Sequence, residues 1–447
     1  MGKRLTVIAV AAFLFLQASF AQAASGQTKP DSARNEQLAG FVRLWSETKY
    51  SFAYFDKVPE VDWDRVLVDY LPQFAQPQDI HQYYRLLQRC LAQLHDGHTR
   101  VDVEVCAGPG DDRPPLLVKR IQDRAVVTEI AEAPELVAQS IKVGCEIVTV
   151  DGRAVRDILE KDIYPYISAS TSQMRDGASY RRILDGPRGS RATVVVRDPD
   201  GSEHTVTLTR NGGSFQTRWT ARQKDFEYRQ LDEGLAYVAL RSFNSPAVGR
   251  EFNGVFDKIR NSKCLVIDVR ENTGGNTLNG YAIISRLIDK RLQGSKWRSP
   301  QYVSAFKSWG RDQKWYEGEI SSVEPAEGKP SFLGPVVVLT SADTGSAAED
   351  FLIPLHYAHR AKLVGERTAG STGNPLVVQL PGGVIALICT KHDTYPDGKE
   401  FVGVGVIPDV DVYPTLQDVT SGRDVILEKG IEVAKSMVSS APAQERR

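Results

Sequence analysis

A serine in the stretch TSADTGSAAEDFL can serve either as a nucleophile or as the residue that begins a helix. Ser346 follows VVVLT, which has the pattern of a short buried strand, and precedes a run with helical spacing. Ser346 and Glu349 fit the S-x-x-E capping box, in which the two side chains bond free amides at a helix start. The same junction directs the amide of Ala347 and the positive end of the helix dipole outward, which suits a nucleophile beside a developing oxyanion. The local sequence therefore predicts one geometry for two roles.

The loop RENTGGN has the same construction, because Gly274 and Gly275 stand between a buried strand and a helix. Glycines let backbone amides come close to a ligand, and a helix start favours negative charge. Neither GxGxxG nor GxxxxGK[ST] is present, which argues against a phosphate site. Two such junctions in one sheet would place a glycine amide and the Ala347 amide on one oxyanion, as a serine hydrolase requires.

A serine nucleophile needs a base, because its hydroxyl is weakly nucleophilic at neutral pH. Among the seven histidines, His98 in LHDGHTRV is the best candidate, since it lies in a glycine-containing loop at the edge of a helical region. From spacing alone, a structural role for this histidine is the simpler interpretation. A metal site at His95 and His98 is a further alternative, but no HExxH helix or cysteine partner accompanies them, so we expect no metal.

The elements that must position these residues fall into three regions. From 34 to 112, apolar residues recur every three or four positions, which predicts an N-terminal helical subdomain. From 113 to 212, short β-like runs predict a β module with a helical insertion. Within it VGCEIVTVDGRAV resembles a PDZ domain, and an ordinary β-rich packing module is the alternative. From 226 to 438, strands and helices alternate, which predicts an α/β core with mainly parallel strands and a site at the strand ends.

The first 23 residues carry two cations, an apolar run and the sequence AQA, which is typical of a secretory signal peptide cut before residue 24. We therefore expect an exported protein, periplasmic or secreted, with no other segment that spans a bilayer. Removing Lys3 and Arg4 changes the formal net charge from −1 to −3, and a nearly neutral chain gives no reason to expect nucleic acid as a partner. The five cysteines are scattered and do not indicate a disulfide framework.

Six segments, taken in order, resemble the C-terminal processing and tricorn-like serine peptidases of family S41. They are LHDGHT, VGCEIVTVDGR, CLVIDVRENTGGN, TSADTGSAAEDF, LVGERTAGSTGN and GVGVIPDVDV, and the similarity covers nearly the whole chain after the signal. The resemblance implies a ClpP/crotonase-like α/β core that carries a helical N-terminal part and a PDZ-like module. It also implies that Ser346 is the nucleophile, and that the amide of Ala347 and one of Gly274 or Gly275 form the oxyanion hole.

The two branches of this family differ in their base. The processing branch carries a lysine in a turn after V-G-E-x-T, where VGERTAGSTG has Ser371 instead. The tricorn-like branch takes a histidine from the loop that closes the helical subdomain. That histidine corresponds to His98, and the serine that precedes it is replaced here by Gly97. The glutamate of this branch has no counterpart in register; Glu400 in GKEFVGVGV lies two residues earlier, and the other acids are Asp96 and Asp397.

We therefore expect an exported serine endopeptidase that cleaves protein or peptide substrates through an acyl-enzyme on Ser346, with His98 as general base and Glu400 as the orienting acid. The PDZ-like module would bind an extended peptide, such as the C-terminal segment of a substrate, by strand addition. No metal or organic cofactor is implied. The alternative is a binding protein for an apolar ligand or peptide that keeps this fold with a vestigial site. An α/β-hydrolase esterase is disfavoured, because Ser346 has no G-x-S-x-G elbow around it.

Overall fold

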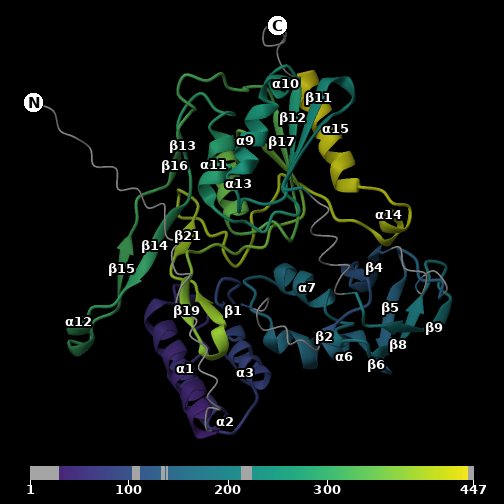
Figure 1. The fold of residues 1–447 in the computed structure, drawn as a ribbon. Helices are drawn as coiled ribbons and strands as arrows, with labels where there is room; N and C mark the ends of the chain where they lie inside the picture. Colours follow the sequence, from purple (N-terminus) through teal and green to yellow (C-terminus); the bar gives the residue numbers. More distant parts are fainter. Residues whose placement is uncertain (1–29, 103–110, 132–135, 137–138, 213–223, 441–447) are drawn as a thin grey trace, which may run out of the picture.

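The computed structural model describes residues 30–102, 111–131, 136, 139–212 and 224–440 of the chain, and the expected signal peptide lies outside these residues. A helical region, a β module and an α/β core follow one another along the chain (Figure 1). The fold is therefore a mixed α/β fold, as the sequence predicts.

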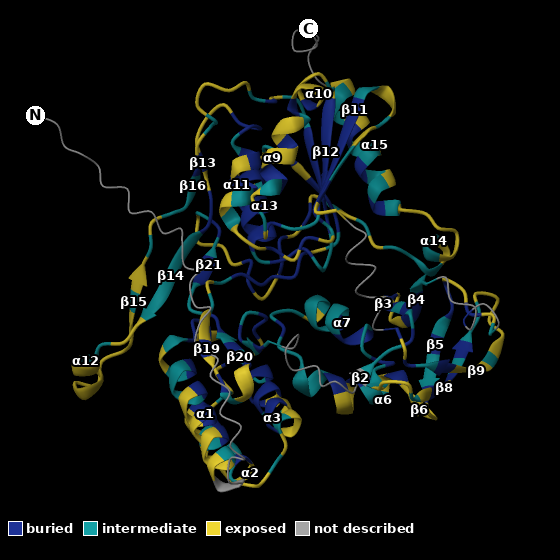
Figure 2. Ribbon diagram, viewed as in Figure 1, coloured by how far each residue is buried: buried dark blue, intermediate teal, exposed yellow. Residues whose placement is uncertain are grey.

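The core is built on a six-stranded sheet with the order β10-β11-β12-β17-β18-β22. Only the β10–β11 pair is antiparallel, and the other neighbours are parallel. Every residue of β11, β12 and β17 is buried, because helices cover both faces of the sheet (Figure 2). The strands are β10 (Phe226–Gln230), β11 (Leu235–Leu240), β12 (Cys264–Asp268), β17 (Val336–Thr340), β18 (Lys362–Gly365) and β22 (Val410–Asp411).

Alternate residues of these strands pack on opposite sides of the sheet. Val238, Ile267 and Val338 belong to one hydrophobic cluster, together with residues of the helices that follow the strands. Tyr237, Val266 and Leu339, for example, belong to the other cluster, which includes the last helix. On the first side lie α9 (Ala247–Gly254), α10 (Phe256–Arg260), α11 (Thr277–Ile284) and α13 (Ala347–Tyr357), and on the second side lies α15 (Val425–Ser440).

The three neighbouring strands β12, β17 and β18 run in the same direction, so their carboxyl ends meet at one edge of the sheet. The loop RENTGGN follows β12, the loop that contains Ser346 follows β17, and the loop ERTAGSTG follows β18. This topology brings together three loops that are far apart in the sequence. They form one wall of the candidate site.

The helical region supplies the opposite wall. It contains α1 (Pro30–Ser51), α2 (Trp63–Phe74) and α3 (Ile80–Ala92), and α3 leads into the loop LHDGHT and the short strand β1 (Arg100–Val101). Strand β1 pairs with β20 (Ile385–Ile388), which in turn pairs with β19 (Leu376–Gln379). The loop after α3 is therefore held against the core by a small sheet that joins residues 100–101 to residues 376–388.

The β module has its own hydrophobic cluster, which runs from Leu116 to Leu208. Its antiparallel strands have the order β3-β4-β5-β8-β9, and β6 pairs with β5. They are β3 (Leu116–Ile121), β4 (Arg124–Ile130), β5 (Glu146–Val150), β6 (Arg153–Ala154), β8 (Arg191–Arg197) and β9 (Glu203–Thr209). The predicted helical insertion contains α6 (Val155–Ile158) and α7 (Ser172–Tyr180), and α7 lies next to the core (Figure 1).

Several smaller elements complete the structure. An arm made of β14 (Lys296–Gln301), α12 (Ser304–Ser308) and β15 (Lys314–Glu317) extends from the core beside β21 (His392–Thr394) (Figure 1). Two two-stranded sheets pair β13 (Leu292–Gln293) with β16 (Ser322–Val323) and β2 (Asp111–Asp112) with β7 (Gly186–Pro187), and α14 (Leu416–Thr420) precedes the last helix. Within the described ranges, no helix combines the length and apolarity needed to cross a membrane.

Candidate active site

Ser346 lies in a sharp turn between β17 and α13, and its side chain is partly exposed. Its backbone has φ 55° and ψ −127°, a conformation that residues with a side chain rarely adopt and that persists only where the surroundings enforce it. Its amide donates to the carbonyl of Ser371 at 2.8 Å. The Ser346 hydroxyl makes no capping hydrogen bond, so the predicted capping box is wrong. The strained turn presents the hydroxyl outward and leaves it available to another partner.

That partner is His98. The distance from His98 Nε2 to Ser346 Oγ is 3.0 Å, although the two residues are 248 positions apart in the sequence. Burial lowers the pKa of His98 from 6.5 to about 3, and the nearby charges of Arg100 and Lys391 lower it further. The imidazole is therefore neutral at neutral pH and can accept a proton at Nε2.

The loop that carries His98 is fixed by buried polar contacts. Asp96 accepts hydrogen bonds from Thr99 Oγ1 at 2.6 Å and from Ser170 Oγ at 3.2 Å. The amide of Gly97 donates to the same Ser170 hydroxyl at 3.0 Å. Asp96, an alternative acid in the sequence, thus holds the loop and makes no recorded bond to the His98 ring.

The second nitrogen of His98 faces Ser371. The distance from His98 Nδ1 to Ser371 Oγ is 2.8 Å, and Ser371 is only 1% exposed. The amide of Ser371 donates to Glu349 Oε2 at 2.8 Å. The sequence predicts no role for Ser371, because in the motif it marks only the absence of a lysine.

Glu349 is completely buried beneath the site. Its Oε1 accepts hydrogen bonds from the Thr368 hydroxyl and from the Gly370 amide, the latter at 2.8 Å. Burial raises the pKa of Glu349 from 4.5 to about 7, while the hydrogen bonds from Thr368, Ser371 and Gly370 oppose this rise. The carboxyl group expected to cap α13 is instead the anchor of the loop after β18.

Gly274 of the RENTGGN loop lies against Ser346. A Cβ atom built on Gly274 would be 2.6 Å from Ser346 Cβ and 3.0 Å from the Ala347 amide nitrogen, and both glycines have positive φ. The Gly274 amide is already occupied, because it donates to Asn272 Oδ1 at 2.9 Å. Phe243 bonds the residues on either side of Gly275, so the Gly275 amide faces away from Phe243.

The structure does not bring Glu400 to His98. Glu400 Oε1 lies 2.8 Å from Nε2 of another histidine, His392, and its Oε2 accepts from Lys57 Nζ at 2.9 Å. Both nitrogens of the His98 ring already have serine partners. Asp397, the other alternative, accepts from the amide of its neighbour Lys399. Among the described residues, no group of three His, Cys, Asp or Glu side chains is arranged to hold a metal ion.

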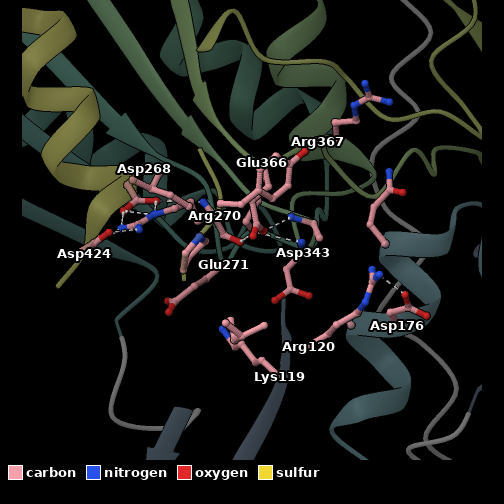
Figure 3. A pocket seen from close by; sticks show the side chains of 18 of the residues that line it. Lys119, Arg120, Asp176, Asp268, Arg270, Glu271, Asp343, Glu366, Arg367 and Asp424 are labelled. Carbon is pink, nitrogen blue, oxygen red and sulfur yellow. Dashed lines mark hydrogen bonds and ion pairs between the residues drawn. The ribbon is translucent and has the colours of Figure 1, made fainter. Parts of the chain in front are cut away.

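A cavity of about 920 Å³, lined by many charged residues, adjoins the loop that contains Ser346, between the β module and the carboxyl ends of the core strands (Figure 3). It reaches Ser341, Ala342 and Asp343 but is not lined by Ser346 itself. Cationic and anionic side chains both line it, and Arg181 of the β module forms an ion pair with Asp343 across the boundary.

Comparison with known proteins places this site in a family. Residues 234–412 match the model of "Peptidase family S41". A chloroplastic C-terminal processing peptidase of Tetradesmus obliquus is 26% identical over 411 residues, which cover 85% of this chain and 78% of that protein. A tricorn protease homolog of Streptomyces coelicolor is 22% identical over 413 residues, which cover 86% of this chain and 31% of the homolog.

Among solved structures, mature CPAF has the same fold, with a TM-score of 0.73 and 18% identity over 92% of this chain and 99% of its own. The photosystem II D1 C-terminal processing protease gives a TM-score of 0.50 at 22% identity, over 87% of this chain and 98% of its own. The family match, the processing-peptidase relatives and the shared fold agree with one another. The family match covers residues 234–412, and the processing-peptidase relatives indicate that the chain is a serine-type peptidase.

Proposed function

We propose that this chain is an exported endopeptidase that hydrolyses peptide bonds through an acyl-enzyme on Ser346, with His98 as the general base. The distance of 3.0 Å between His98 Nε2 and Ser346 Oγ carries this proposal. Export rests on the signal-like pattern of residues 1–23. The names of the processing peptidases support protein or peptide substrates, with cleavage in the C-terminal segment as the first specificity to test.

In the proposed reaction, Nε2 of His98 takes the hydroxyl proton as Ser346 Oγ bonds to the carbonyl carbon of the scissile peptide. The negative charge that develops on the carbonyl oxygen is stabilised by backbone amides. Ala347 supplies one amide, because it is the first residue of α13 and has no acceptor within its own helix. Gly275 is the better second donor, since the amide of Gly274 already bonds Asn272.

The intermediate then collapses. The carbon–nitrogen bond breaks as His98 returns the proton to the leaving amine, and the acyl group remains on Ser346. Water attacks the acyl-enzyme by the same route, with His98 again as the base. During these steps the imidazole of His98 is transiently positive. A group that bonds its Nδ1, as the Ser371 hydroxyl does, can therefore change the rate of proton transfer.

Labelling with a fluorophosphonate followed by peptide mapping tests the nucleophile. We expect an adduct on Ser346 in the folded protein and none in Ser346→Ala. Ser308→Ala, which changes an exposed serine in α12, should label like the wild type. An adduct that persists in Ser346→Ala would contradict the assignment.

Hydrolysis of an unfolded protein such as casein tests the base. His98→Ala should lower kcat/KM by at least about 10³-fold with little effect on the circular dichroism spectrum. Full activity of this variant would overturn the role of His98. A folded wild-type protein that neither labels nor cleaves would favour the binding protein with a vestigial site.

A further inference from the structure

Ser371 joins the nucleophile, the base and a buried carboxylate. Its hydroxyl lies 2.8 Å from His98 Nδ1, its amide donates to Glu349 Oε2 at 2.8 Å, and its carbonyl accepts from the Ser346 amide at 2.8 Å. Glu349 itself lies in the first turn of α13, which begins directly after Ser346. The contacts thus close a ring from the nucleophile through α13, Glu349, Ser371 and His98 back to the nucleophile.

We propose that Ser371 is the positioning residue for His98 and that Glu349 fixes Ser371 from below. The inference rests on the proposed function, since it describes how the same base is oriented. For Nε2 to accept the Ser346 proton, the neutral ring must carry its hydrogen on Nδ1. In that tautomer the Ser371 oxygen accepts the hydrogen on Nδ1, and the contact holds the ring in the orientation that points Nε2 at Ser346.

Ser371 is rigid enough for this role. It is 1% exposed, and both its backbone groups are bonded to parts of the site. Glu349 receives three hydrogen bonds from the segment 368–371, and none of its recorded hydrogen bonds or ion pairs comes from a cation. The carboxyl group therefore holds the loop that carries Ser371, the hydroxyl partner of the ring that becomes positive during the reaction.

Gly97 provides an independent geometric argument. A Cβ atom built on Gly97 would lie 2.7 Å from Ser371 Oγ and 2.4 Å from Met174 Cε. The Ser371 hydroxyl therefore occupies the space into which a side chain at position 97 would point. One hydroxyl at a time fits beside His98, supplied either by residue 371 or by residue 97, and Gly97 leaves the space to Ser371.

Steady-state kinetics with the wild type and two variants test this inference. Ser371→Ala should lower kcat about 10- to 100-fold with KM changed less than about threefold, as for lost orienting contacts. Thr372→Ala is the matched control, because it removes a buried hydroxyl that bonds Asp393 rather than His98. We expect its kcat to stay close to the wild-type value. An unchanged kcat in Ser371→Ala would overturn the proposal.

The exchange between positions 97 and 371 gives a rescue experiment. Gly97→Ser alone should lower kcat, because its side chain collides with Ser371 and Met174. The double variant Gly97→Ser with Ser371→Ala removes the first collision and restores a hydroxyl beside His98, so its kcat should exceed that of Ser371→Ala about tenfold. If the reduction in kcat of the double variant equals the product of the two single reductions, the hydroxyl at position 97 does not replace the one at position 371, and the argument from Gly97 is refuted.

A measurement on the wild type covers the case in which a variant does not fold. Nitrogen-15 spectra of labelled histidine should show His98 at pH 7 with its hydrogen on Nδ1, and a hydrogen on Nε2 would overturn the proposal. Failure of the proposed function gives a different pattern, because the wild type would then carry no fluorophosphonate adduct. An adduct on Ser346 together with full kcat in Ser371→Ala would refute only the role of Ser371.

Discussion

Replacing Glu349 with glutamine should change how the free energy of unfolding depends on pH. In the folded protein the pKa of Glu349 is raised from 4.5 to about 7, and that of His98 is lowered from 6.5 to about 3. Glu349 therefore adds stability as the pH falls from 7 toward 4.5, because the folded protein holds a proton that the unfolded chain releases. His98 removes stability as the pH falls below 6.5, because only the unfolded chain then gains a proton.

The magnitude follows from these values. Each pH unit over which only one state binds the proton changes the free energy of unfolding by about 1.4 kcal/mol. Between pH 7 and pH 5, Glu349 thus adds about 2 kcal/mol, and the partly exposed His98 removes about 1–2 kcal/mol. The two contributions nearly cancel in the wild type. In Glu349→Gln only the destabilising contribution of His98 remains. The free energy of unfolding of the variant, relative to that of the wild type, should therefore be about 2 kcal/mol lower at pH 5 than at pH 7.

Urea unfolding followed by circular dichroism at pH 5, 6, 7 and 8 measures this difference. The variant should also be less stable at every pH by about 1–3 kcal/mol, because both oxygens of Glu349 accept hydrogen bonds and the NH2 group that replaces one of them cannot. Glu319→Gln, at an exposed glutamate, should follow the wild-type profile at all four pH values. Profiles of Glu349→Gln and wild type that stay parallel between pH 7 and pH 5 would refute the reasoning.

Three further outcomes can be measured directly. Gly274→Ala should abolish fluorophosphonate labelling and destabilise the fold by about 1–3 kcal/mol, because the new Cβ would meet Ser346 and φ at this position is +113°. Gly254→Ala is the control, since the space around Gly254 is open, and it should change neither labelling nor stability. The acid limb of kcat/KM should lie well below pH 6.5, because the lowered pKa of His98 keeps the base neutral there; a midpoint at 6.5 would contradict this. Arg181→Met removes an ion pair with Asp343. Because both partners are partly exposed, the free energy of unfolding should change by less than about 1 kcal/mol, while KM for long peptides should change. An unchanged KM would exclude a role for this contact in substrate entry.

The sequence predicts the core well because its pattern there is strong. The runs LAYVAL, CLVID and VVVLT are apolar throughout, and such runs are typical of parallel strands covered on both faces. Ser346 and His98 could be singled out because their residue types and loop positions suit catalysis. Their distance of 3.0 Å could not be derived, since it depends on the pairing of β1 with β20 across most of the chain.

The orienting residues were harder to predict for a physical reason. The spacing of Ser346 and Glu349 fits a local capping motif, whereas Glu349 in fact bonds a loop about 20 residues further along the chain. Glu400 is a sequence candidate only because it lies two residues before the position of the family's glutamate. This closeness in sequence says nothing about which histidine the side chain faces, and Glu400 bonds His392. Gly97 and Ser371 each looked like a departure from a motif. The structure shows that they share one space, and this relation is not visible in either segment alone.

The pairing of β1 with β20 has a consequence for the order of events during synthesis. His98, the proposed base, precedes β1, and among the described residues β1 pairs with β20, which ends at Ile388. While the ribosome is still adding the residues before β20, the loop with His98 has no strand to pair with and is not held against Ser346. The nucleophile and the base are therefore brought together only after most of the chain has been made. On the proposed mechanism, we expect a nascent chain to be inactive toward its neighbours, and toward its own unfinished chain, until its core is complete.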